Sequence, residues 1–165
     1  RPTARVIFSQ PILITNFMGQ RSLMFRLANA RFNHVVEANL NLVMVQDAVT
    51  PEGISLRQQI DLPLARNRSA IFSFSWTVRH IIDETSPLYK LTADDIAQKQ
   101  IQFIVSLLGH DETFAQNIRT RHVYYGKDIV WDRHFVDIVH RHSAIDGSDG
   151  GGQVVVDIEK ISELQ

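Results

Sequence analysis

Four consecutive polar residues form the group in this sequence that could most readily do chemistry: His110, Asp111, Glu112 and Thr113. They combine an imidazole, two carboxylates and a hydroxyl, so the group can carry charge, titrate and exchange hydrogen bonds. Apolar, alternating residues flank it on both sides. A polar group on such a scaffold is typical of a functional loop held in one place. A solvated hairpin end has the same composition and is the alternative.

Other chemistry finds little support among the residue types. His140 and His142 would share one face of a strand, but no third ligand follows at a zinc-site spacing. The segment 146–150 resembles the start of a calcium loop, but its fifth position is Gly150, which offers no side-chain oxygen. The chain has no cysteine, and no nucleotide, serine-hydrolase or metalloprotease motif is present. We therefore expect no catalytic residue, no metal and no cofactor, and hence no enzyme.

The bulk properties indicate one domain that binds no nucleic acid. A chain of 165 residues is long enough to bury a core, and its net charge of −1 gives no footprint for nucleic acid. No apolar run approaches the roughly 18 residues of a membrane span. Because the sequence opens abruptly at Arg1-Pro2, we expect it to be part of a longer protein.

The polar group lies between two predicted strands, which together make a hairpin over 101–125. Ile101, Phe103, Val105 and Leu107 recur at the period of two that is typical of a strand with one buried face. Gly109 is expected to end this strand, and strand-like composition resumes over 116–125. The two strands would hold the polar group at the end of the hairpin.

The longest predicted strand covers 35–45 and has two contrasting faces. Its apolar face contains Val36, Ala38, Leu40, Leu42 and Met44. Its polar face contains Glu37, Asn39 and Asn41. Such a row is commonly just the solvated side of a sheet, so the pattern alone leaves its role open.

The remaining pattern predicts an all-β fold. Further strands are expected at 5–9, 12–17, 23–28, 54–62, 72–78, 129–140 and 153–158, with a basic loop over 63–69 and a flexible loop over 146–152. One short helix should begin at Thr92, which forms a capping-box-like pair with Asp95. About nine strands at this spacing indicate an immunoglobulin-like β-sandwich with one short helix, covering 1–165 as one domain.

Three segments in one order carry a family resemblance. They are 23–31 leading into Val36-Glu37-Ala38, then 80–89 (His-Ile-Ile-Asp-Glu-Thr-Ser-Pro-Leu-Tyr), then 109–116 (Gly-His-Asp-Glu-Thr-Phe-Ala-Gln). Together with Val6-Ile7-Phe8-Ser9 near the start, they resemble the C-terminal cytoplasmic domain of inward-rectifier potassium channels, most closely the prokaryotic members. The competing reading is a soluble immunoglobulin-like module that binds protein or small ligands.

The resemblance implies a homotetramer that extends a transmembrane potassium pore into the cytoplasm, at the inner face of the cell membrane. It also places the protein in the broad class of voltage-gated channels. Glu37, with Asn39 and Asn41, would face the ion vestibule and attract potassium and blockers such as magnesium or polyamines. The loop at the pore apex, which can constrict the pore, would consist of Gly109, His110, Asp111, Glu112, Thr113, Phe114, Ala115 and Gln116.

Two further expectations concern charged side chains. In a hairpin centred near Gln116-Asn117, Glu112 and Arg121 would lie opposite each other, and the resemblance points to the same pair as a brace for the loop. His110 would make gating sensitive to pH.

Departures from the family affect blockers and lipids. Arg66-Asn67-Arg68 stands where animal channels carry acidic residues, and Leu108 replaces a second acidic position, which argues against strong polyamine block. The basic cluster that contacts anionic lipid headgroups is reduced to Arg1 and Arg5, which also argues against lipid activation of the animal type.

Overall fold

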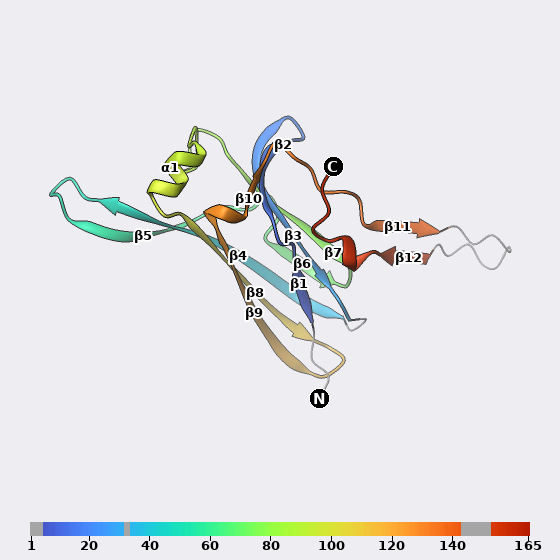
Figure 1. Cartoon of the computed structure of the whole chain (residues 1–165). Helices are drawn as coiled ribbons and strands as arrows, with labels where there is room; N and C mark the ends of the chain where they lie inside the picture. Colours follow the sequence, from blue (N-terminus) through green and yellow to red (C-terminus); the bar gives the residue numbers. More distant parts are fainter. Residues whose placement is uncertain (1–4, 32–33, 143–152) are drawn as a thin grey trace.

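The computed structural model describes residues 5–31, 34–142 and 153–165, and two five-stranded sheets make up most of it (Figure 1). The first sheet has the order β1-β3-β2-β10, with β7 paired to β3. The second has the order β5-β4-β8-β9, with β6 paired to β4. With one short α-helix, this confirms the predicted all-β, immunoglobulin-like sandwich.

The element bounds are as follows. The first sheet contains β1 (Val6–Phe8), β2 (Ile12–Phe17), β3 (Gln20–Asn29), β7 (Ser75–Ile81) and β10 (Ile129–Trp131). The second contains β4 (Val35–Val49), β5 (Ser55–Asp61), β6 (Arg68–Phe72), β8 (Gln102–Asp111) and β9 (Gln116–Tyr125). A separate hairpin pairs β11 (Val139–His142) with β12 (Gln153–Val156), and the helical turns are α1 (Ala93–Gln98), η1 (Gly126–Asp128) and η2 (Ile158–Lys160).

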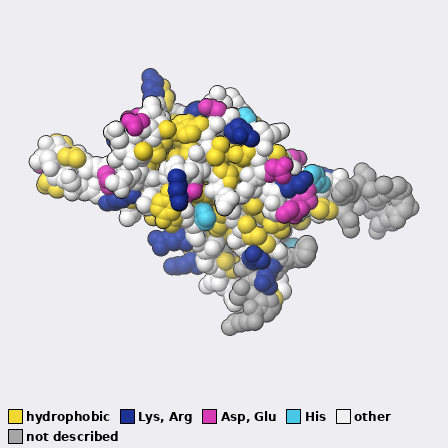
Figure 2. Space-filling model, in the orientation of Figure 1, with side chains coloured by type: hydrophobic (Ala, Val, Ile, Leu, Met, Phe, Trp, Pro, Cys, Tyr) yellow, Lys and Arg dark blue, Asp and Glu magenta, His cyan; other side chains and the backbone are white. Residues whose placement is uncertain are grey.

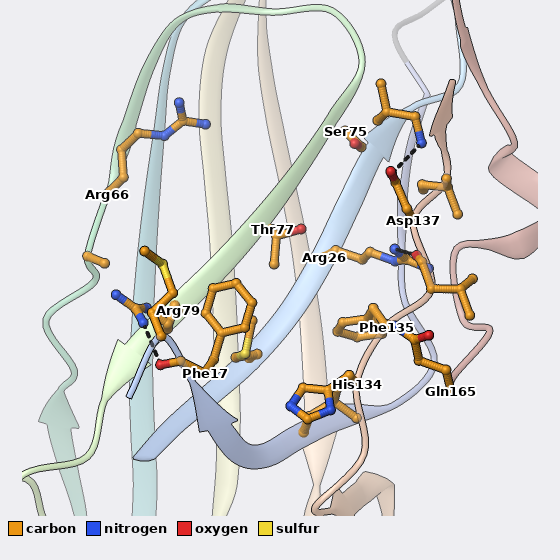
Figure 3. Close-up of a pocket in the computed structure, with 17 residues that line it drawn as sticks. Phe17, Arg26, Arg66, Ser75, Thr77, Arg79, His134, Phe135, Asp137 and Gln165 are labelled. Carbon is orange, nitrogen blue, oxygen red and sulfur yellow. Dashed lines mark hydrogen bonds between the residues drawn. The ribbon is translucent and has the colours of Figure 1, made fainter. Parts of the chain in front are cut away.

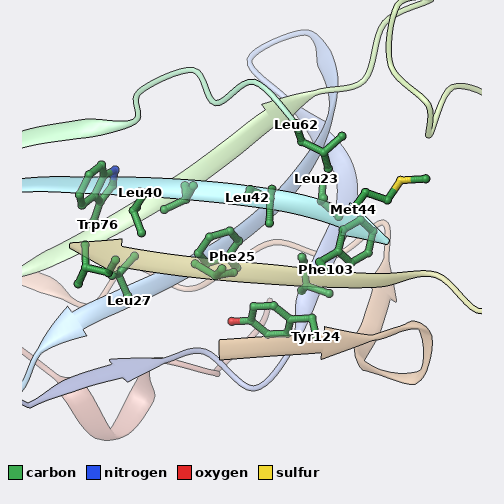
Figure 4. Packing of buried hydrophobic residues seen from close by; sticks show 14 of the residues in the cluster. Leu23, Phe25, Leu27, Leu40, Leu42, Met44, Leu62, Trp76, Phe103 and Tyr124 are labelled. Atoms are coloured by element: carbon green, nitrogen blue, oxygen red, sulfur yellow. The ribbon is translucent and has the colours of Figure 1, made fainter. Parts of the chain in front are cut away.

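The core lies between the facing sides of the two sheets (Figure 4). Phe25 and Leu27 of β3 meet Leu40 of β4 and Phe103 of β8, and all four are at most 1% exposed. Tyr124 of β9 is also buried, and its hydroxyl donates to the carbonyl oxygen of Ser9 at 2.6 Å. Because both sheets contribute apolar side chains to one cluster, the sandwich holds its two outer faces in fixed positions.

The strand predictions need three corrections. Strand β6 begins within the predicted basic loop over 63–69, because Arg68 and Ser69 pair with Asn39 and Ala38 of β4. The predicted strand over 129–140 is two strands, since β10 pairs in parallel with β2 and the chain then leaves the sheet. Phe74, which falls within the predicted strand over 72–78, lies in the turn between β6 and β7 and is 47% exposed. The predicted loop over 146–152 lies outside the described residues.

The helix begins as predicted. Thr92 Oγ1 accepts from the Asp95 amide at 3.1 Å, and the Asp95 carboxylate accepts from the Thr92 amide at 2.9 Å, which completes a capping box. Over the part of the chain that the structure describes, no helix has both the length and the apolar character needed to cross a membrane.

An arm formed by β4 and β5 extends beyond the sandwich (Figures 1 and 2). At its end, Val49 and Ile54 are 69% and 60% exposed. A two-stranded ribbon contributes little stability by itself, so this arm depends on the continuation of β4 into the sheet.

His80 is a buried histidine whose surroundings favour the neutral ring. Its Nδ1–H donates to the Pro63 carbonyl at 2.7 Å, and its Nε2 then accepts from the Ser86 hydroxyl at 2.8 Å. Burial lowers the pKa of His80, and the Pro63 hydrogen bond and the charge of Asp83 offset this only in part. The folded protein therefore binds a proton at this ring less readily than the unfolded chain does.

We expect the free energy of unfolding to fall as the pH drops below about 6.5, the pKa of an unperturbed histidine. The unfolded state takes up the proton first, so stability is greatest above that value and decreases toward the lower folded-state pKa. Urea titrations at several pH values measure this slope, which should become shallower in His80→Gln. Part should persist, because burial also lowers the pKa of His122. An identical slope in both proteins would exclude His80 as the source.

Candidate functional site

The outer face of the second sheet carries the polar row that the sequence predicted. On β4, Glu37, Asn39 and Asn41 are exposed, whereas Ala38 and Leu40 between them are at most 1% exposed. A strand turns successive side chains to opposite faces, so the three polar residues share one exposed face. The apolar face differs from the prediction at one position: Val35, not Val36, is fully buried.

A β-bulge explains this difference. Val36 pairs with His110 and Asn39 pairs with Leu108, so β4 has one more residue than β8 between these pairs. Glu37 lies in the bulge with φ of 49°, a left-handed conformation that is uncommon for a residue with a side chain. The bulge therefore reverses the alternation before Glu37 and sets the direction in which its carboxylate points.

Gly109 lies opposite the bulge and does not end the strand as the sequence suggested. Strand β8 continues through it to Asp111. A Cβ on Gly109 would lie 2.7 Å from Cγ1 of Val35, whose side chain is fully buried. The glycine is thus needed for close approach between the strands and not for a turn.

We expect Gly109→Ala to lower the free energy of unfolding by about 1–3 kcal/mol, because overpacking forces buried neighbours to move. Urea denaturation measures this difference. Ser106→Ala on the same strand is the matched control, and its effect should stay within about 0.5 kcal/mol. A Gly109→Ala protein as stable as the parent would show that the bulge relaxes freely.

The carboxylate of Glu37 is paired within its own chain. Arg68 of β6 donates to Glu37 Oε2 from Nη2 at 2.5 Å and from Nε at 3.2 Å. Both side chains are more than half exposed, so the pair adds about 0.2–1 kcal/mol to stability at most. The pair matters more for the charge of this face than for stability, because Arg68 neutralises Glu37, the one acidic residue of the polar row.

Two further arginines lie on the same face of the sheet. Arg121 pairs with Ser106, which pairs with Asn41, and Arg119 pairs with Leu108, which pairs with Asn39. Both arginines are exposed, and neither takes part in an ion pair between described residues. Around the polar row the face is therefore neutral to positive, although the family resemblance had implied that Glu37 attracts cations there.

The tip of the β8–β9 hairpin is shorter than the predicted loop. Gly109, His110 and Asp111 end β8 and Gln116 begins β9, so the turn consists of Glu112, Thr113, Phe114 and Ala115. The buried Asp111 carboxylate accepts from the amides of Thr113 and Phe114 at 2.9 and 3.3 Å, as a side-chain-closed turn does. Next to the turn, His110 Nδ1 lies 3.1 Å from Asn117 Oδ1. The pH sensitivity expected from His110 stays a prediction.

The predicted register of this hairpin is wrong. Asp111 pairs with Gln116, so the centre lies between Thr113 and Phe114, and Arg121 faces Ser106 instead of Glu112. Glu112 lies six positions after Ser106, which corresponds to about 20 Å along a strand. The error came from centring the hairpin near Gln116-Asn117, whereas the turn consists of residues 112–115. Glu112 and Arg121 therefore cannot brace the loop across one hairpin.

The remaining predicted sites are the lipid contact at Arg1 and Arg5 and the histidines considered for a metal site, and the structure describes only some of these residues. Arg5 is exposed just before β1, and Arg1 lies outside the described residues. Among the described residues, no group of three histidines or carboxylates is placed to hold a metal ion. His140 instead pairs with Asp157, at 2.9 Å between Nε2 and Oδ2. The sequence reasoning named Arg68 as a departure from the family but missed its pairing with Glu37, and it did not place Arg119 on the site face. A hairpin centred on residues 112–115 would have placed Arg119 there.

Comparison with known proteins identifies a family for nearly the whole chain. Residues 6–164 match the family model described as "Inward rectifier potassium channel C-terminal domain". The chain is 46% identical over 138 residues to the inward rectifier potassium channel Kirbac3.1 of Paramagnetospirillum magnetotacticum, covering 84% of this chain and 47% of that protein. It is 30% identical over 150 residues to the ATP-sensitive inward rectifier potassium channel 8 of Mus musculus, covering 88% of this chain and 35% of that channel.

The chain thus spans about half the length of the first of these relatives and about a third of the second. The matched family is an ion-channel domain and not an enzyme class. These descriptions favour a channel domain over a soluble binding module, and they do not mention gating by voltage.

Proposed function

The chain belongs to the family of inward rectifier potassium channel C-terminal domains, and from this membership we propose that it forms the cytoplasmic, pore-extending part of a tetrameric potassium channel. In this proposal four copies surround the conduction axis, and the outer face of the second sheet lines the ion vestibule. The transmembrane pore belongs to the rest of the channel.

The observation that carries the proposal is the exposed row of Glu37, Asn39 and Asn41 beside the β8–β9 hairpin. Polar side chains on a long strand can line a water-filled passage for hydrated potassium. The hairpin turn, residues 112–115, would lie at the narrow end of that passage as its gate. The exposed Val49 and Ile54 on the β4–β5 arm supply apolar surface that contact between subunits could bury.

The proposal also covers blockers and lipids. Magnesium and polyamines would enter the vestibule, and the pairing of Glu37 with Arg68 weakens their attraction. Arg5, exposed just before β1, is the described residue that would meet anionic lipid headgroups.

Cysteine modification tests the vestibule, because this domain has no native cysteine to react, and the unsubstituted channel shows the response of cysteines elsewhere. Asn41→Cys in the channel that contains this domain should make potassium current sensitive to a cationic thiol reagent applied from the cytoplasmic side. Thr77→Cys is the control, since Thr77 is exposed on β7 of the opposite sheet. Current insensitive at position 41, or equally sensitive at both positions, would contradict the proposal. Light scattering with chemical crosslinking tests the tetramer separately.

A further inference from the structure

A cavity on the first sheet, opposite the sheet that carries the polar row, is lined by side chains of the kinds that bind small ligands. It measures about 490 Å³ and lies between the outer face of the first sheet and the chain segment 134–139 (Figure 3). Its walls combine apolar side chains, including Phe17, Met24 and Phe135, with several cationic ones. Small-molecule sites in proteins have this size and this mixture of an apolar lining with a few polar groups.

Two arginines stand diagonally adjacent on the floor of this cavity. Arg26 of β3 pairs with Thr77 of β7, and Arg79 of β7 pairs with Met24 of β3. Diagonal neighbours on one face of a sheet lie within reach of long side chains, so two like charges share this floor. Arg66 and His134 add basic groups to the lining. The lining contains one acid, Asp137, whose carboxylate accepts from the Val139 amide at 3.0 Å.

Arg26 is buried, and no carboxylate of the residues that the structure describes lies in ion-pair contact with it. It is 3% exposed and donates to the carbonyl oxygens of Ile161, Val136 and Lys160 at 2.6, 2.5 and 2.9 Å. Its guanidinium also lies 4.5 Å from the centre of the Phe135 ring. Burial lowers the pKa of Arg26 to about 10, although the charges of Asp137 and Glu163 act in the opposite direction. The cavity wall thus holds a desolvated positive charge that neutral carbonyls compensate only in part.

Arg79 is the cation best placed to receive a ligand. It donates from Nη1 to the Phe17 carbonyl at 3.1 Å and lies 5.4 Å from the centre of the Phe17 ring. A guanidinium has five N–H donors, so this one bond leaves donors for an anion. Figure 3 shows Arg79 and Phe17 side by side at the cavity, which places an apolar surface directly beside the cationic group.

We infer that this cavity binds a small amphiphilic monoanion, a carboxylate with a short hydrocarbon tail. The carboxylate accepts hydrogen bonds from Arg79 within the positive field of Arg26, and the tail packs on Phe17, Met24 and Phe135. The site lies on the opposite sheet from the polar row, so the inference does not depend on the pore.

Titration calorimetry of the chain with three probes tests this inference. Octanoate should bind at millimolar concentration. Octanol, which has the tail without the charge, should bind about tenfold more weakly, as expected when a hydrogen bond to a charged group is lost. Inorganic phosphate, which has charge without the tail, should give no heat of binding. No binding of octanoate, or equal binding of octanol, would overturn the inference.

Two variants locate the site. Arg79→Gln should weaken octanoate binding by about tenfold, with circular dichroism confirming that the variant is folded. Arg57→Gln is the matched control, because Arg57 is a surface arginine on the other sheet, paired with Asp47. Octanoate binding that Arg79→Gln leaves unchanged, or that both variants weaken equally, would place the anion elsewhere.

Discussion

In a potassium channel built on this domain, Arg68→Gln is expected to strengthen block by internal magnesium by on the order of tenfold at low salt. Arg68 neutralises Glu37, the one acidic residue of the polar row. Removing the arginine changes the charge of the Glu37–Arg68 pair from about zero to −1 in each subunit, which adds a charge of −4 around a fourfold ring. Each Glu37 carboxylate would then attract cations without a neutralising partner, as the family resemblance implies for this position, although Arg119 and Arg121 remain on the same face.

The magnitude follows from Coulomb's law. Two unit charges about 8 Å apart in water interact by about 0.5 kcal/mol, and a divalent cation facing four carboxylates collects eight such terms. Salt screening removes much of this sum and leaves on the order of 1–2 kcal/mol, which corresponds to about tenfold in affinity. The effect should therefore shrink as the ionic strength of the internal solution rises.

Two controls isolate the charge of Glu37. Adding Glu37→Gln to Arg68→Gln should return magnesium block to the parent level, because both charges are then absent. Arg21 lies on β3 of the first sheet and pairs with Asp132. Arg21→Gln removes this arginine far from the polar row and should leave block unchanged. If Arg68→Gln leaves block at the parent level in low salt, the polar row does not face the conduction path.

The sequence predicts the sandwich well because alternation is a local signal. Ala38, Leu40 and Leu42 are buried as expected, and Glu37, Asn39 and Asn41 are exposed. The capping box at Thr92 is equally local, since it involves residues three apart. Each of these features depends on neighbours in the chain and needs no knowledge of the other strands.

What the sequence does not reveal depends on pairing between distant segments. The bulge at Glu37 shows only in the register with β8, and the partner of Glu37, Arg68, is 31 residues away. Because the predicted centre of the hairpin was wrong, Arg121 was placed opposite Glu112 instead of its actual neighbour, Ser106. The charge of the site face is where prediction and structure differ most, because the effect of Glu37 can be judged only once Arg68 is placed beside it.

Strand β3 shows the same limit for burial. Its core-facing residues alternate with Met24, Arg26 and Ala28, and these three are also at most 4% exposed. The C-terminal part of the chain covers this face, with Ile138 and Ile161 packed on Ala28 in a second apolar cluster. From the sequence alone, an arginine on a strand is predicted to be exposed to solvent unless the segment that covers it is known.

Arg26→Leu is expected to lower the free energy of unfolding by about 3 kcal/mol, because it leaves buried carbonyls without donors. The guanidinium joins two separate stretches of the C-terminal part, through the carbonyl of Val136 and those of Lys160 and Ile161. Leucine can fill the space but can donate no hydrogen bond. The segments that depend on these bonds should detach from β3 first.

The main core should survive this change, since its apolar side chains belong to a different cluster from Ile138 and Ile161. We therefore expect hydrogen exchange to rise over 134–142 and 153–165 while β4 and β8 stay protected. Arg21→Leu on the same strand is the matched control. Its exposed pair with Asp132 should contribute no more than about 1 kcal/mol. Equal protection of the C-terminal segments in Arg26→Leu and the parent would mean that apolar contact, and not the buried guanidinium, holds them on the sheet.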